Sequence, residues 1–439
     1  MNQFENPELL VVHAVDAEGP LNETMEATFE RLKYIFDIDL EANHENLQKL
    51  KLGVFKTGDL EIDEKLIKVF SGDILNYNKN WHELDLMNKK IFSKGFRNKY
   101  IDDFNNLWKI TWFCLDHVNY LDNPREKAIG YSVVFNYYKN LIMNHNFGDE
   151  IQWHFHPKAL SQSSISAATS YANSMNEIIQ ILCRKILDDY WFPTCFRPGF
   201  HAERQDCNLF LEQWIPFDYG NQRVDGEAPQ SDMENGRFGN WEWAPITWRG
   251  YKPSSTHYDK EGSLNRTIFR CLNLGTRLRL LNRSHVIECF QEAHDSGNAI
   301  LAFTDHDFRD ITPDIEYLYN ELHAQRRKFP GVKIRFCTAE EAAQRIINKL
   351  NYRLELTIKL ENNILKVSLK EGQIFGSQPF LAIKGKRGDY FSDNFDCLKH
   401  DAIWTYTFDE QTINLSDVEL IGVAAGGKFG GHDVKILKL

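Results

Sequence analysis

The sequence predicts an α/β domain with a parallel sheet, followed by a smaller antiparallel β domain. Up to about residue 350, short apolar runs alternate with helical patterns, whereas the chain after residue 352 alternates with a two-residue period. Strands that alternate with helices are typical of parallel sheets, which can close into a barrel. The 439 residues exceed one ordinary core. We therefore expect two domains, at residues 1–350 and 353–439.

Four short apolar runs are the predicted strands of the parallel sheet. The first, residues 9–15 (LLVVHAV), stops at Asp16. Similar runs lie at 108–115, 150–156 and 299–306. Continuous apolar runs of this length fit strands that are buried on both faces.

Helical periodicity fills the segments between these strands. Residues 128–144 and 174–189 place apolar side chains three or four positions apart. Residues 338–350 open with a threonine followed by acidic residues, as a helix start should. Residues 23–107 carry many Asn and Lys residues with mixed helical periodicity, and we interpret them as an insertion after the first strand.

The region after residue 352 has no helical stretch. The segment YRLELTIKLENNILKVSLKEG alternates apolar and polar residues, and its NN and EG steps predict turns. This pattern favours a small antiparallel domain of sandwich type at residues 353–439.

The composition favours a folded protein and argues against nucleic acids and membranes as its partners. Hydrophobic residues make up 42% of the chain, so it can bury a core. The net charge of -11 argues against nucleic acid and anionic membranes as partners. No run reaches the about 18 apolar residues that a membrane span needs. With eight scattered cysteines and no leader pattern, we expect reduced thiols and a cytoplasmic location. Nothing in the sequence indicates an oligomeric state.

Acidic and imidazole side chains follow two of the predicted strands. Asp16 and Glu18 are two residues apart, as are His154 and His156 in WHFHP, so each pair points to one side of its strand. Two histidines and a carboxylate are a recurrent ligand set of catalytic zinc. We expect Glu18, His154 and His156 to bind one divalent metal ion, with zinc as the first choice. The alternatives are an acidic turn ended by Gly19-Pro20 and two unrelated histidines.

Two further strand ends carry polar residues. Arg197 follows WFPTCF and could hold a carboxylate through two hydrogen bonds, although an ordinary surface ion pair is the alternative. His306 ends the run LAFTDH, where Asp305 and Asp307 could set its tautomer; a capping or solvated histidine is the alternative. The stretch NWEWAPITWRGY at 240–251 fits a sugar-stacking platform and ordinary packing equally well.

Taken in order, these segments resemble the polysaccharide deacetylase (NodB-homology, carbohydrate esterase family four) superfamily over residues 8–350. The resembling segments are VDAEG, TWFCLD, DEIQWHFHP, FRPGF, IPFDYG and LAFTDHDF. The resemblance implies a distorted (β/α) barrel of about seven strands, with the insertion at 23–107, and it does not reach the β domain. Two departures are a Glu at the second acidic position and Lys158 in place of a histidine four residues after His154.

The resemblance also implies roles. Asp16 would be the catalytic base, Arg197 would orient Asp16, and His306 would be the general acid. His201, Trp153 and Tyr219 are candidate substrate contacts within the resembling segments and the residues that follow them.

The implied reaction is the metal-dependent removal of an N-acyl group, first of all N-acetyl, from a sugar or glycan precursor. One alternative is an amidohydrolase of the allantoinase or deformylase kind that acts on a small non-sugar amide. The other is a catalytically inactive carbohydrate-binding protein.

Overall fold

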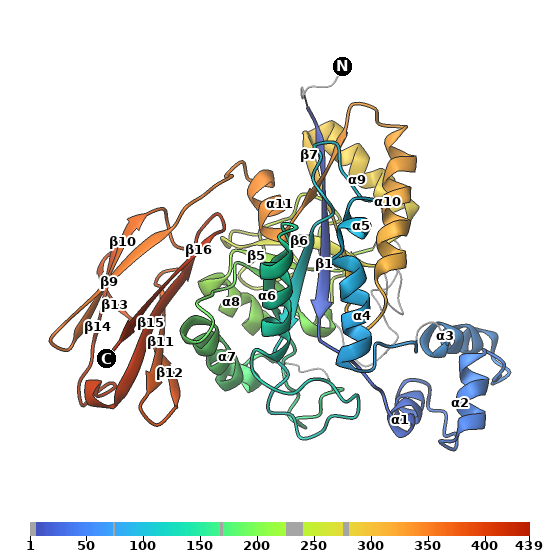
Figure 1. Ribbon diagram of the computed structural model, residues 1–439, viewed down its shortest axis with the longest axis horizontal. Coiled ribbons are helices and arrows are strands. Elements are labelled where there is room, and N and C mark those ends of the chain that lie inside the picture. The colour runs from blue at the N-terminus through green and yellow to red at the C-terminus, as the bar shows by residue number, and fades with distance from the viewer. Residues whose placement is uncertain (1–5, 73–74, 167–169, 225–239, 275–280) are drawn as a thin grey trace.

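The computed structural model describes residues 6–72, 75–166, 170–224, 240–274 and 281–439 (Figure 1). In this part of the chain, seven parallel strands close into a ring in chain order, which confirms the predicted barrel. The strands are β1 (Glu8–Ala17), β2 (Ile110–Leu115), β3 (Glu150–Phe155), β4 (Cys195–Pro198), β5 (Phe217–Asn221), β6 (Thr267–Asn273) and β7 (Asn298–His306).

The barrel is distorted at β1. The first half of β1, from Glu8 to Val12, pairs with β8 (Lys333–Cys337). Its second half, from His13 to Ala17, pairs with β2. Strand β8 therefore separates β1 from β2 at the amino-terminal end of the barrel, and the ring closes at the carboxyl-terminal end. Barrel enzymes place their active sites at this second end.

The two-residue period of each strand divides its side chains between the barrel interior and the helices outside. On β1, Leu10, Val12 and Ala14 lie in the interior cluster, which also holds Cys195 and Ile300. Alternate residues of β1 belong instead to the cluster that the outer helices cover, namely Leu9, Val11, Val15 and Ala17. Position 16 therefore faces the interior, because alternation continues to the strand end.

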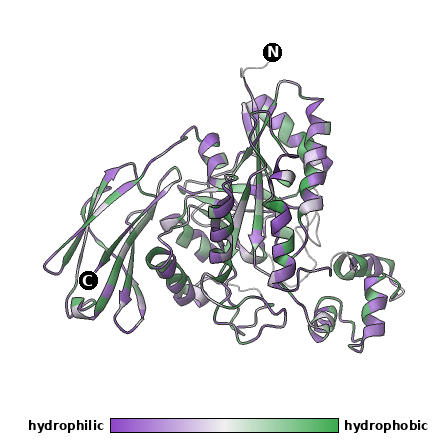
Figure 2. Ribbon diagram, viewed as in Figure 1, coloured by the Kyte–Doolittle hydropathy of each residue, from purple (hydrophilic) through white to green (hydrophobic). Residues whose placement is uncertain are grey.

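Eight helices of the described chain accompany the barrel (Figure 1). They are α4 (Trp81–Ile91), α5 (Lys94–Arg97), α6 (Val133–His145), α7 (Met175–Leu187), α8 (Gln205–Trp214), α9 (Arg283–Ser296), α10 (Thr312–Arg326) and α11 (Ala339–Ile346). Helices α6, α7 and α11 confirm the three predicted from periodicity. Figure 2 shows hydrophobic residues on the strands and on parts of the helices.

The predicted insertion contains two kinds of structure. Helices α1 (Met25–Phe36), α2 (His44–Lys51) and α3 (Leu60–Phe70) share a small core of their own, to which Phe308 contributes. Figure 1 shows them beside the barrel. Helix α4 packs on the barrel instead, since its Leu84 and Ile91 join the cluster around β1. The separate part of the insertion therefore ends before α4, which is the barrel's own connection from β1 to β2.

The carboxyl-terminal domain is the predicted β sandwich. Its sheets have the orders β13-β14-β10-β9 and β12-β11-β15-β16, and Trp404 and Ile421 share the core between them. The expected turn at NN joins β9 to β10. The strands are β9 (Glu355–Glu361), β10 (Ile364–Glu371), β11 (Phe380–Gly385), β12 (Tyr390–Asp393), β13 (Asp396–Lys399), β14 (Ile403–Thr407), β15 (Val418–Gly426) and β16 (His432–Lys438).

The sandwich packs against the barrel through α7. Phe380 and Ala424 share an apolar cluster with Ile178 and Ile186 of this helix. Gln180 Nε2 also donates a hydrogen bond of 2.8 Å to the backbone oxygen of Tyr390. The barrel domain and the sandwich are therefore joined by one apolar cluster, which includes residues of both.

We expect Gly376→Ala to weaken this contact. A Cβ at Gly376 would lie 1.9 Å from the backbone oxygen of Gln213, at the end of α8. The matched control is Gly388→Ala, because Gly388 has almost the same φ, 86° against 84°, and nothing within 4 Å of its Cβ position. In denaturant unfolding, Gly376→Ala should lose about 1–3 kcal/mol more stability than the control. Equal losses would contradict a tight contact at this position.

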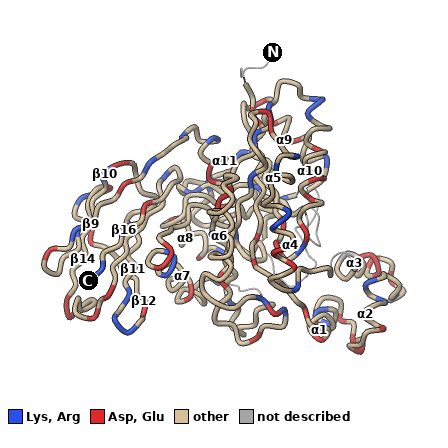
Figure 3. The backbone as a smooth tube through the Cα atoms, viewed as in Figure 1, with Lys and Arg blue, Asp and Glu red and all other residues tan. Residues whose placement is uncertain are grey.

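Acidic and basic residues are interspersed along the barrel, the helical insertion and the sandwich in Figure 3. Among the described residues, no helix has the length and apolar character required to cross a membrane.

Candidate metal centre and active site

Six of the predicted site residues meet at the carboxyl-terminal end of the barrel. Asp16 and Glu18 come from β1 and the residue after it, and His306 ends β7. His154 lies near the end of β3 and His156 directly follows that strand, and Arg197 lies on β4. They meet because these strands are parallel neighbours whose last inward-facing positions lie at one edge.

Glu18, His154 and His156 form a buried cluster that could bind a metal ion. One ligand atom from each residue lies within 4.8 Å of the others. His154 Nδ1 donates to the backbone oxygen of Arg197 at 2.9 Å, so its Nε2 is the ring nitrogen that faces the cluster. That Nε2 lies 2.9 Å from His156 Nε2, which lies 3.4 Å from Glu18 Oε1.

The chemistry of this donor set fits a divalent ion. Burial lowers the pKa of His156 to about 4, so its ring is neutral at physiological pH. Two imidazoles and one carboxylate are the ligands that catalytic zinc accepts, and the hydrogen bond behind His154 is the usual support for such a ligand.

Asp16 is held by Arg197 beside this cluster. The guanidinium donates from Nε to Oδ1 at 2.6 Å and from Nη2 to Oδ2 at 3.0 Å. Arg197 Nη1 donates to the backbone oxygen of Tyr219 at 2.5 Å. Burial raises the pKa of Asp16, but the charge of Arg197 and the hydrogen bonds that it donates act against burial, and the pKa lies well below its usual range. Asp16 is therefore an oriented, ionised carboxylate.

His306 lies at the edge of the same cluster. Its Nε2 is 3.8 Å from Asp16 Oδ2 and 3.8 Å from Glu18 Oε1. Its side chain is 18% exposed, whereas those of the other groups are more deeply buried. Burial lowers the pKa of His306 to about 3, against the opposing effect of the two carboxylates. His306 thus presents a neutral ring to solvent and to Asp16.

The expected partners of His306 point elsewhere, and this part of the sequence interpretation is wrong. Asp305 accepts a hydrogen bond of 2.9 Å from His13 Nε2 on the outer face of β1. Asp307 accepts from the backbone N–H groups of Glu18 and Gly19, at 2.9 and 3.0 Å. Asp307 therefore fixes the backbone that carries Glu18.

The three predicted substrate contacts have different surroundings. Gln222 Nε2 donates to His201 Nδ1 at 3.2 Å, and burial, together with the charge of Arg197, holds the pKa of His201 well below its usual value. Trp153 faces outward into the apolar cluster under α7. The Tyr219 hydroxyl donates to the backbone oxygen of Ala339 at 2.6 Å. The structure therefore brings His201 towards the site but packs Trp153 and the Tyr219 ring in the core.

Sequence reasoning missed several residues of the loop between β2 and α6. The Lys127 ammonium forms an ion pair with Glu18 Oε2. The Tyr120 hydroxyl donates to the backbone oxygen of His156 at 2.9 Å, and the His117 ring stacks on Tyr120. His117 could have been suspected because it lies two residues after the end of the predicted strand at 108–115. Lys158 is not a ligand, since its Nζ pairs with Glu177 at 2.6 Å.

The aromatic stretch at 240–251 contains both buried and exposed tryptophan side chains. Trp241 and Trp248 are buried, and Trp241 Nε1 donates to the backbone oxygen of His201 at 3.0 Å. Trp243 is 54% exposed. Packing accounts for the two buried indoles, whereas Trp243 is the exposed one of the three and has the Lys260 ammonium 3.8 Å from its ring centroid.

We expect Gly199→Ala to weaken metal binding. A Cβ at Gly199 would lie 2.3 Å from Cδ2 of His156 and would displace that ring. Disturbed support of a ligand typically costs about 10–100-fold in affinity, and zinc titration would measure the change. Gly95→Ala is the control, because nothing lies within 4 Å of its Cβ position. Equal affinity in the two variants would argue against His156 as a ligand.

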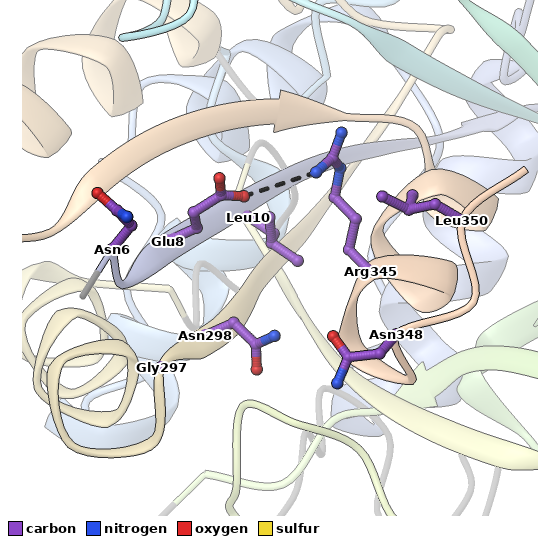
Figure 4. Close-up of a pocket in the computed structure, with 8 residues that line it drawn as sticks. All are labelled: Asn6, Glu8, Leu10, Gly297, Asn298, Arg345, Asn348 and Leu350. Carbon is purple, nitrogen blue, oxygen red and sulfur yellow. Dashed lines mark ion pairs between the residues drawn. The ribbon is translucent and has the colours of Figure 1, made fainter. Parts of the chain in front are cut away.

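A separate pocket of about 460 Å³ lies at the amino-terminal end of the barrel (Figure 4). Glu8, Asn298 and Arg345 line it, and Arg345 Nη1 lies 3.7 Å from Glu8 Oε2. This pocket contains none of the residues of the metal cluster.

No protein-family model and no curated protein matches this chain.

Proposed function

We propose that this protein is a metal-dependent hydrolase that removes an N-acyl group, most simply N-acetyl, from a sugar or glycan precursor. One observation carries the proposal: a potential His-His-Glu metal site, an Arg-held carboxylate and a more exposed histidine share one end of the barrel. This combination supplies ligands, a base and an acid for amide hydrolysis.

Each residue has a role in the proposed reaction. Glu18, His154 and His156 would hold the ion, with zinc as the first choice. When bound, such an ion supplies Lewis acidity to the amide carbonyl. Asp16 accepts a proton from the attacking water, and Arg197 keeps the carboxylate ionised and oriented. His306, the more exposed ring, is neutral before the reaction; its Nε2 lies 3.8 Å from Asp16 Oδ2, so it takes that proton from Asp16 and delivers it to the leaving nitrogen.

The exposed indole of Trp243 supports a sugar, because apolar sugar faces stack on aromatic rings. An amidohydrolase acting on a small non-sugar amide would use the same groups. A panel of N-acetylated free, nucleotide-linked and lipid-linked sugars, together with small amides, would separate these candidates.

The test combines this panel with metal analysis. The purified protein should bind about one divalent ion per chain and release acetate from at least one sugar. A chelator should abolish that activity, and His154→Ala should lose the ion. Equal metal content in wild type and His154→Ala would refute the metal assignment. A metal-loaded protein that binds sugars without hydrolysing any would favour a carbohydrate-binding protein.

A further inference from the structure

Lys127 shares the carboxylate of Glu18 with the two imidazoles. Its ammonium contacts Oε2, while Oε1 lies 3.4 Å from His156 Nε2 and 3.8 Å from His154 Nε2. The side chains of Lys127 and Glu18 are only 8% and 4% exposed. The ion pair is therefore protected from the solvent screening that makes surface pairs weak.

The backbone around Lys127 is fixed, so its ammonium is held ready at this position. Asn123 Oδ1 accepts from the Lys127 backbone N–H at 3.0 Å, and Asn123 Nδ2 donates to the Lys127 backbone oxygen at 2.9 Å. The Asn22 backbone N–H donates to the backbone oxygen of Arg125 at 3.0 Å. This last bond ties the loop to the segment that follows Glu18.

Two consequences follow for a metal ion at the cluster. Lys127 orients Glu18, because it occupies one carboxylate oxygen and leaves the other towards the imidazoles. It also places a fixed positive charge beside a site for a second cation. Like charges in a poorly solvated site repel strongly, and a carboxylate already paired with an ammonium is a weaker ligand.

We propose that Lys127 is a positioning residue that sets the metal affinity of this site by keeping Glu18 oriented and partly neutralised. The inference rests on the proposed metal-dependent function. It predicts a site whose ion is held less tightly than the three ligands alone would hold it, and which therefore exchanges its ion more readily.

The experiment is a zinc titration of the metal-free full chain against a chromophoric chelator. Lys127→Met removes the charge and should lower the Kd for zinc about tenfold or more. Lys127→Arg keeps the charge and should stay within about threefold of wild type. Lys158→Met is the matched control, since Lys158 is also buried and paired with a glutamate, but with Glu177. It should leave the Kd within about threefold of wild type.

The outcomes separate this inference from the proposed function. If wild type and Lys127→Met bind zinc equally, or the variant binds more weakly, the inference is wrong and the proposed function stands. If only Lys127→Met binds zinc, the inference is supported and the wild-type protein is not a zinc enzyme. If neither binds, both fail. Thermal unfolding confirms that each variant is folded, and Lys127→Gln replaces Lys127→Met if the latter is not.

Discussion

Asp16→Asn should lower kcat by about 10²–10⁴-fold, the usual contribution of a general base. Asparagine has nearly the size of aspartate but cannot accept the proton of the attacking water. The metal content should be unchanged, because Asp16 is not one of the three clustered ligands. Acetate release from the best substrate of the panel, measured at saturating concentration, would give the change in kcat.

Stability must be measured alongside activity, because Asp16 is the buried partner of Arg197. Removing one partner of a buried ion pair costs about 3–5 kcal/mol, although the asparagine oxygen can still accept one bond from the guanidinium. Asp305→Asn is the matched control, since Asp305 is also buried and hydrogen-bonded near the end of a neighbouring strand but contacts His13. A folded Asp16→Asn protein with more than about a tenth of wild-type kcat would exclude Asp16 as the base.

The strand ends were the predictable part of the site. Parallel strands bring their carboxyl ends to one edge, and a two-residue period decides which side chains face inward. Together these rules place Asp16, His154 and His306 at one end of the barrel from the sequence alone. Applied consistently, the same period would have excluded Trp153, because a residue adjacent to the inward-facing His154 must face outward.

The contacts from loops were not predictable in the same way. Lys127 reaches Glu18 across 109 positions of sequence, and Asp307 binds the Glu18 backbone across 289. Neither contact is formed within a periodic element, so no pattern in the sequence predicts it.

The end of the insertion was missed for a related reason. Helices α3 and α4 have similar periodicity, and only tertiary packing shows that α4 belongs to the barrel.

His306→Ala should lower kcat for an N-acetyl substrate by about 10²–10⁴-fold while changing KM little. An amine is a poor leaving group without a proton, and His306, whose Nε2 lies 3.8 Å from Asp16 Oδ2, is placed to pass on the proton that Asp16 takes from the water. With an activated ester such as 4-nitrophenyl acetate, the leaving phenolate departs as an anion and needs no acid. The kcat of the variant should therefore fall by about tenfold or less with this ester.

Comparing the two substrates separates proton donation from mere support of the site, because a structural defect would reduce both activities alike. Equal losses with amide and ester would assign His306 a structural role, and the leaving nitrogen would then take its proton from another group.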